Sequence, residues 1–165
     1  MTMKNLKDVY LDQLQDMWSA NTQSLKMVAE MGKHAKNAEL SKALIAGVSG
    51  INDGIVKLEQ LCNEHGIKPS DEHCKGMEGL VKEARSHAIE TDFDDDDTRD
   101  AVIITQYQRF AHYAIAGYGC LRAFANRLEL DGDGAILQGC LDASYDGDKH
   151  MTHIATQGGV NAAAV

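Results

Sequence analysis

Apolar side chains in the first part of the chain recur with the spacing of one face of an α-helix. Between Leu6 and Met31 they follow alternating steps of four and three residues, which keeps them in one continuous stripe. The stripe consists of Tyr10, Leu14, Met17, Asn21, Ser24, Val28 and Met31. Two polar residues, Asn21 and Ser24, lie in its middle. The pattern predicts a long helix from about Leu6 to Met31 that stops at Gly32.

A second stripe predicts a helix from about Glu39 to Glu64, which ends at Gly66 with Pro69 just beyond. The stripe contains Leu40, Leu44, Gly47, Ile51, Gly54, Leu58 and Leu61. The glycines at positions 47, 50 and 54 each cost about 1 kcal/mol relative to alanine in an exposed helix. Such glycines indicate either the close approach of another backbone or positions that larger side chains once occupied.

Periodicity predicts two further long helices, from about Thr98 to Leu128 and from about Ala135 to Ala155, separated by a turn at Asp131–Gly134. The connection before them, residues 67–97, is long enough to hold one short helix, and no strand-like alternation appears. We therefore expect an all-α fold, a four-helix bundle of ferritin-like topology. Its short extra helix should lie in the long crossover between helices 2 and 3.

Length and composition favour one soluble globular domain over residues 1–165, with a flexible tail at residues 157–165. The formal net charge of −9 repels phosphate backbones and anionic lipids, so neither a nucleic acid nor a membrane is an expected partner. The chain shows no signal-peptide core and no membrane span. The four cysteines form no Cys-x-x-Cys pair, which is typical of free thiols in a cytoplasmic protein.

Acidic residues 92 and 94–97 precede the third predicted helix. A solvated loop whose charge suits the next helix N-terminus explains this run. The alternative, a calcium site, lacks the spacing and the terminal glutamate of an EF-hand loop.

One stretch of the third predicted helix is distinctive and reads Gln108-Arg109-Phe110-Ala111-His112-Tyr113-Ala114-Ile115-Ala116-Gly117-Tyr118-Gly119-Cys120-Leu121-Arg122. It resembles the third-helix signature of the YciE/YciF-like family of ferritin-like bundles, which reads roughly Glu-His-Tyr-Glu-Ile-Ala-Gly-Tyr-Gly. Further segments match in order and spacing, namely Leu6–Asp16, Val56–Leu61, Cys74–Leu80 and Arg99–Ala101. The resemblance covers Leu6 to about Ile154 and implies a stress-associated bacterial family.

The departures from the family pattern fall where the resemblance places carboxylates. In the first helix, Asn21 stands where the family has a glutamate. At the glutamate positions of the other three helices, this chain has Ser49-Gly50, the alanines at 111 and 114, and Ala143-Ser144. A dinuclear site in such a bundle needs these anionic ligands to offset two buried divalent ions. The resemblance therefore implies a degenerate metal site at Asn21, Gly50, Ala111, Ala114, Ala143 and Ser144. We expect no cofactor, and a centre of apolar and small side chains in which Asn21 and Ser24 are hydrogen-bonded.

These departures favour a non-enzymatic structural or binding protein. One alternative is a metalloprotein with a site rebuilt from His112, Asp146, Asp148, His150 and His153, since His150 and His153 have the i, i+3 spacing of two ligands on one helix face. An exposed polar helix end explains the same residues. The other alternative is a small-molecule carrier that uses the vacated bundle centre.

A homodimer is the expected assembly. The resemblance suggests association, and several large apolar residues cannot all face one bundle axis, namely Trp18, Leu25, Ile103, Phe110 and Phe124. Some of them should form a second apolar surface, unless a wide core and the crossover helix cover them all.

Overall fold

The computed structural model describes residues 3–157, and the regular structure of this part is helical throughout. The long helices are α1 (Leu6–His34), α2 (Ala38–Glu64), α4 (Asp96–Arg127) and α5 (Asp131–Gln157). Between α2 and α4 lie a short 3-10 turn η1 (Pro69–Asp71), helix α3 (Lys75–Ala84) and a π-helical turn η2 (Arg85–Ile89). Apart from Gln157, the last residue of α5, the expected tail at 157–165 lies outside the described residues.

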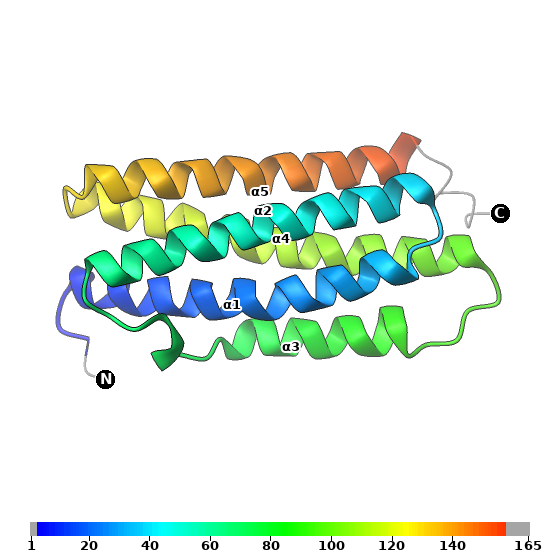
Figure 1. Cartoon of the computed structure of the whole chain (residues 1–165), viewed down its shortest axis with the longest axis horizontal. Helices are drawn as coiled ribbons and strands as arrows, with labels where there is room; N and C mark the ends of the chain where they lie inside the picture. Colours follow the sequence, from blue (N-terminus) through cyan, green and yellow to red (C-terminus); the bar gives the residue numbers. More distant parts are fainter. Residues whose placement is uncertain (1–2, 158–165) are drawn as a thin grey trace.

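The order of the helices requires a long crossover. Helices α1 and α2 are antiparallel, as are α4 and α5, whereas α2 and α4 run in the same direction (Figure 1). The chain must therefore return along the length of the bundle after α2, and α3 forms most of that return. The prediction of an all-α four-helix bundle with a short extra helix in the crossover is confirmed.

The predicted end of the first helix is wrong. Helix α1 continues through Gly32 to His34, and the Ala35 N–H donates to the Met31 carbonyl. A Cβ atom placed on Gly32 would lie 3.4 Å from Cβ of Leu44, so this glycine allows α1 and α2 to approach each other closely. It provides packing space and does not terminate the helix.

The predicted turn at Asp131–Gly134 is also wrong, because these residues form the first turn of α5. The carboxylates of Asp131 and Asp133 favour helix at this position, where they complement the positive end of the helix dipole. The reversal lies just before, at Glu129, whose φ of 58° is left-handed.

The core follows the predicted stripes. All seven residues of the first stripe are buried in α1. In α2, Leu40, Leu44, Leu58 and Leu61 are fully buried, whereas the middle of its stripe, at Gly47 and Ile51, is only half-buried. The α2 side of the bundle therefore packs tightly at both ends and more loosely at its centre.

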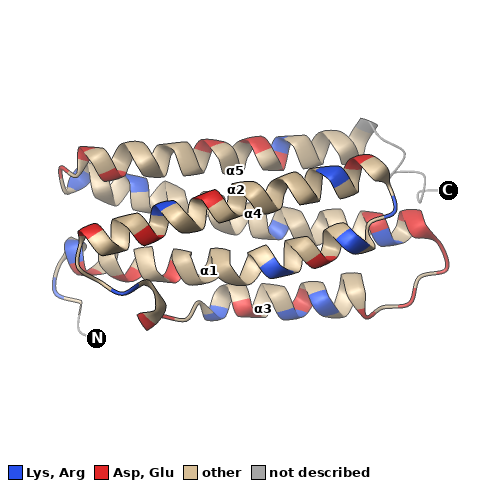
Figure 2. Ribbon diagram, in the orientation of Figure 1, with Lys and Arg blue, Asp and Glu red and all other residues tan. Residues whose placement is uncertain are grey.

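Helix α3 covers one side of the bundle by packing against α1 and α4. Arg85 at its end donates two hydrogen bonds, of 3.0 and 2.7 Å, to the Glu30 carboxylate of α1. Arg109 of α4 donates to Glu83 at 3.1 Å. The acidic run lies in the connection that enters α4 (Figure 2), where the Asp95 carboxylate accepts from the Thr98 N–H. The opposite side, between α2 and α5, has no covering helix among the described residues.

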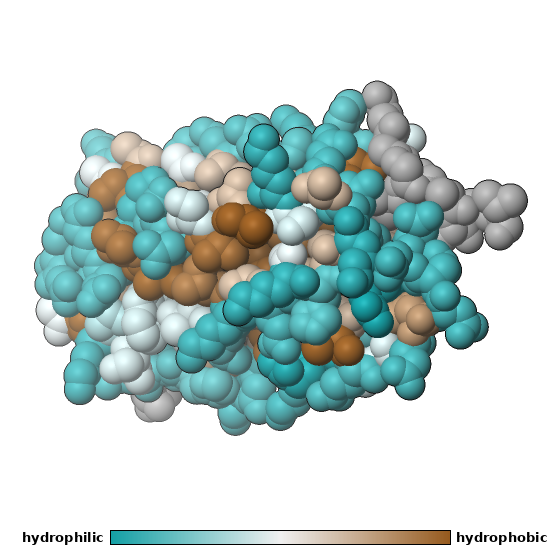
Figure 3. Space-filling view, turned by 45° about the vertical axis from the view of Figure 1, so that its right-hand side comes forward, coloured by the Kyte–Doolittle hydropathy of each residue, from teal (hydrophilic) through white to brown (hydrophobic). Residues whose placement is uncertain are grey.

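The five apolar residues expected to form a second surface divide into two groups. Ile103 and Phe110 are buried in the core, so they provide no such surface, because the core extends to the side that α3 covers. Trp18, Leu25 and Phe124 remain half-buried. The large apolar side chains that are well exposed in the described part include Ile45 and Val56 of α2, and Figure 3 shows an apolar area ringed by polar residues in the middle of one face.

No helix in residues 3–157 combines the length and the apolar character that crossing a membrane requires.

Candidate ligand-binding cavity

A cavity of about 330 Å³ lies at the centre of the bundle, and α1, α2, α4 and α5 all contribute to its wall. The six positions at which the sequence lacks the expected carboxylates all line it: Asn21, Gly50, Ala111, Ala114, Ala143 and Ser144. Sequence reasoning therefore located the centre of the bundle correctly. The lining consists mainly of apolar and small side chains, as expected, but the expectation that they pack the centre is wrong, because they line a space that they do not fill.

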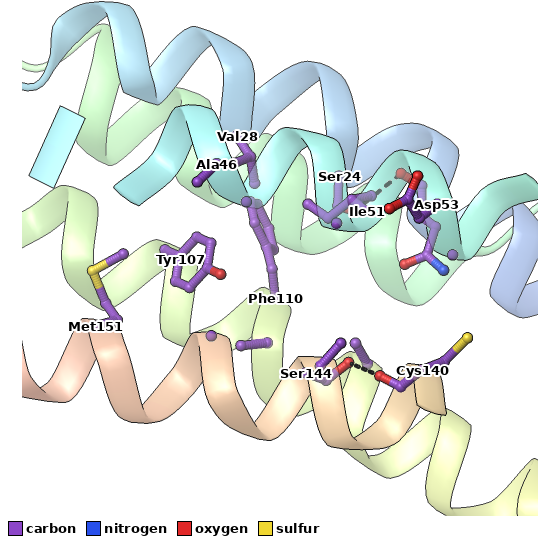
Figure 4. A pocket seen from close by; sticks show the side chains of 18 of the residues that line it. Ser24, Val28, Ala46, Ile51, Asp53, Tyr107, Phe110, Cys140, Ser144 and Met151 are labelled. Carbon is purple, nitrogen blue, oxygen red and sulfur yellow. Dashed lines mark hydrogen bonds between the residues drawn. The ribbon is translucent and has the colours of Figure 1, made fainter. Parts of the chain in front are cut away.

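The cavity has a floor and a mouth. Its residues from α1, which are Asn21, Ser24 and Val28, are buried, and its residues from α4 are buried or half-buried, with Tyr118 3% exposed. Its residues from α2 and α5 include exposed ones, among them Gly50 and Ala143. The cavity therefore opens between α2 and α5 (Figure 4), away from α3, which packs against α1 and α4. Both of these helices carry small residues at the mouth, which keeps it unobstructed.

The buried polar groups of the floor are hydrogen-bonded, as the sequence predicted for Asn21 and Ser24. Asn21 Nδ2 donates to the Tyr118 hydroxyl at 2.6 Å, and Ser24 Oγ donates to the Asn21 carbonyl at 3.1 Å. Burial is the main cause of a raised pKa for Tyr118, so its hydroxyl remains protonated at neutral pH. A Cβ on Gly54 would lie 2.7 Å from this hydroxyl, so the glycine in α2 makes room for Tyr118.

Tyr107 forms the other end of the cavity, where its ring lies near two glycines on facing helices. A Cβ would lie 3.5 Å from the ring at Gly47 of α2 and 2.9 Å from the hydroxyl at Gly147 of α5. Burial, with a smaller contribution from the charge of Asp148, raises the Tyr107 pKa. Sequence reasoning missed Tyr107, because its contacts come from glycines 60 and 40 residues away in the chain.

The charged side chains of the lining lie at the mouth. They are Asp53 and Lys57 of α2, both exposed and of opposite sign. Cys140 of α5 also lines the cavity, and burial raises its pKa while the Lys57 ammonium partly opposes the shift. The interior of the cavity is thus uncharged at neutral pH.

The residues considered for a rebuilt metal site do not converge. His112 Nε2 lies 3.1 Å from Asp148 Oδ1, on an exposed part of the α4–α5 surface, where Gln108 Nε2 also donates to that oxygen at 3.3 Å. His150 lines the cavity, whereas Asp146 and His153 are exposed and outside its lining. Within residues 3–157, no three His, Cys, Asp or Glu side chains are grouped so that they could hold a metal ion.

These features define a class of protein: a four-helix bundle with a crossover helix on one side and an open, uncharged cavity at its centre. The chain belongs to the family described as a domain of unknown function, DUF892, which matches residues 5–164. Together with the relatives that follow, this match confirms the resemblance inferred from the sequence.

Known proteins are similar to this chain along most of their length. Protein YciF of Escherichia coli (strain K12) is 31% identical over 156 residues, which are 94% of this chain and 93% of that protein. The crystal structure of the E. coli stress protein YciF matches with a TM-score of 0.88 at 30% identity and covers 94% of this chain and 98% of that one. YcfI, described as a putative structural protein from Rhodopseudomonas palustris, matches with a TM-score of 0.84 at 31% identity, over 90% of this chain and 94% of its own.

Proposed function

We propose that this chain is a non-enzymatic member of its family that binds a small, largely apolar molecule in the central cavity. The main observation behind this proposal is that the six positions at which this chain lacks the family's carboxylates all line one open cavity of about 330 Å³. This volume falls at the lower end of the range typical of ligand pockets, roughly 300–1,000 Å³.

The chemistry of the lining supports binding and disfavours metal-dependent catalysis. A pair of divalent ions at this place would have Asn21, Gly50, Ala111 and Ser144 around it, none of which carries a charge. Apolar walls from Val28, Ile51, Phe110 and Met151 give a ligand apolar area to contact. On this proposal the dinuclear site is degenerate, and its space serves for binding.

The names of the relatives, a stress protein and a putative structural protein, fit a role without catalysis. We place this role in the bacterial stress response and in the cytoplasm. The four free cysteines support that compartment, because thiols remain reduced there.

Binding of naphthalene tests the proposal directly. In a titration followed by methyl NMR, we expect saturable shifts at cavity methyl groups such as those of Val28, Ile51 and Met151. Leu14 and Leu137, buried in the other apolar cluster and outside the lining, should shift little.

A matched pair of variants assigns the binding to the cavity. Gly50→Leu adds a side chain to the wall, where an ideal Cβ meets no atom within 4 Å, and should abolish binding by filling the space. Gly139→Leu makes the same change at an exposed helical position outside the lining, where a Cβ also meets nothing within 4 Å. It should bind naphthalene like the parent. Equal binding by both variants, or no saturable shift in the parent, contradicts the proposal.

A further inference from the structure

The two ends of the cavity differ in chemistry. Figure 4 shows Tyr107, Phe110, Val28 and Met151 toward one end, whereas Ser24, Ser144 and Cys140 lie toward the other. Asn21 and Tyr118 belong to the second end, since Asn21 donates to the Tyr118 hydroxyl and the Cys140 thiol lies beside it. A ligand therefore meets aromatic and aliphatic surface at one end and a hydrogen-bonding pair at the other.

The hydrogen-bonding pair offers one donor and one acceptor. The Tyr118 oxygen already accepts from Asn21 Nδ2, so its own proton can be donated. The sulfur atom of Cys140 beside it is only a weak acceptor. Asn21 Oδ1 takes part in no hydrogen bond among the described residues. A hydroxyl group both donates and accepts, so it can satisfy Tyr118 and Asn21 at once.

The charges disfavour an ionic head group at this end. Every buried group of the lining is neutral, and the two charged residues at the mouth, Asp53 and Lys57, are exposed and of opposite sign. A buried charge without a partner carries a large desolvation cost. The volume bounds the size as well: a cavity of about 150 Å³ holds one benzene ring, and this cavity has about twice that volume, 330 Å³.

We infer that the ligand is an uncharged, hydroxyl-bearing molecule of about the size of two fused rings, an inference that rests on the proposed function. Its apolar body lies against Phe110, Val28 and Met151. Its hydroxyl accepts from Tyr118 and donates to Asn21 Oδ1.

Three probes with the same ring body separate this inference from the proposed function: naphthalene, 2-naphthol and 2-naphthoate at pH 7. The affinity for 2-naphthol should exceed that for naphthalene by about three- to tenfold, the ratio that one net hydrogen bond gives. The anionic 2-naphthoate should bind most weakly. Dissociation constants from calorimetry or NMR titration provide the comparison.

Two variants test the role of the Tyr118 hydroxyl. Tyr118→Phe should bring the ratio of the 2-naphthol and naphthalene affinities close to one. Tyr113→Phe is the matched control on the same helix, because its hydroxyl contacts Cys74 and Asp16 on the α3 side and lies outside the cavity. It should keep the parent's ratio.

The outcomes are distinct. If naphthalene does not bind, the proposed function fails. If naphthalene binds and Gly50→Leu blocks it, the proposed function stands. The hydroxyl inference is then overturned if 2-naphthol binds no more tightly than naphthalene, if 2-naphthoate binds most tightly, or if Tyr118→Phe retains the ratio. The three parent titrations decide this even if Tyr118→Phe does not fold.

Discussion

Gly117 and Gly119 stand two positions apart on α4, yet their surroundings differ. A Cβ on Gly117 would lie 2.1 Å from Sδ and 3.0 Å from Cγ of the buried Met17. A Cβ on Gly119 would meet no atom within 4 Å. Only Gly117 is therefore required for the contact between α1 and α4.

Gly117→Ala should lower the free energy of unfolding by about 1–3 kcal/mol, because the well-packed Met17 must move. Gly119→Ala should raise it by up to about 1 kcal/mol, because alanine favours helix over glycine and nothing obstructs it. Urea denaturation of both variants gives the comparison. If the two changes have the same sign, the contact with Met17 is not as described.

Ala111, which is half-buried in the wall of the cavity, allows a second test with a single residue. Ala111→Glu restores one family carboxylate without its partners, and burial should raise its pKa above that of the unfolded chain. Ala111→Gln is the neutral control of similar shape. The glutamate variant should match it below the unfolded pKa of about 4.3 and become less stable as the pH rises through the folded pKa. We expect a deficit of about 1–2 kcal/mol at pH 7.

Thermal unfolding of both variants between pH 4 and pH 8 measures this deficit. Equal stability across the range would show that position 111 does not face a poorly solvated interior.

At the scale of elements, helix existence was predictable from the sequence because apolar stripes such as Tyr10 to Met31 persist over many turns. Contacts between segments that are distant in the sequence were not predictable. The Tyr10 hydroxyl donates to Asp133 Oδ2 at 2.7 Å, and His65 Nε2 lies 2.6 Å from the same oxygen, which ties α1, the end of α2 and the start of α5 together. These partners are 123 and 68 residues apart, and no local pattern relates them.

Asp100 is another such contact, and it joins the start of α4 to the loop between α1 and α2. Its buried carboxylate accepts from the Lys36 N–H at 2.9 Å and from the Asn37 N–H at 2.6 Å. Asn37 in turn caps α2 by accepting from the N–H groups of Glu39 and Leu40. One carboxylate thus fixes the residue that begins a second helix.

Asp100→Ala should lower the free energy of unfolding by about 1.5–3 kcal/mol, because two partly buried N–H groups lose a charged acceptor. Asp94→Ala, in the exposed acidic run, is the control and should change it by less than about 0.5 kcal/mol. Chemical denaturation of the two variants is the measurement. A loss no larger for Asp100→Ala than for the control would exclude this role.

At the scale of the whole molecule, only part of the site could be predicted from the sequence. The residues that the sequence pattern related to lost carboxylates, such as Asn21 and Ala114, do meet at one place, because helical periodicity and a known bundle order fix where the inner faces converge. The empty space was one of the alternatives that the sequence left open, but its mouth and the side on which it opens were not predictable. They depend on α3 packing against α1 and α4 and leaving the seam between α2 and α5 open, a choice of side that no stripe in the sequence specifies.

The open seam bears on self-association. The side chains of Ile45 and Val56 on α2 are 63% and 58% exposed, and Tyr145 on α5 is 44% exposed. Soluble monomers seldom leave such a group of large apolar side chains uncovered. We expect this chain to form a homodimer through the outer face of α2. Ile45, Val56 and Tyr145, instead of Ile103 and Phe110, should provide the apolar area of its interface.

Sedimentation at micromolar concentration should show a species of twice the chain mass of 18.0 kDa. Raising the salt should strengthen the dimer, because the net charge of −9 on each copy opposes association and is screened beyond about 8 Å at physiological salt. Val56→Glu should dissociate it. Ala123→Glu, on the exposed face of α4, adds the same charge elsewhere and should not. A single species of 18.0 kDa in the parent would contradict the dimer, and equal dissociation by both variants would place the interface elsewhere.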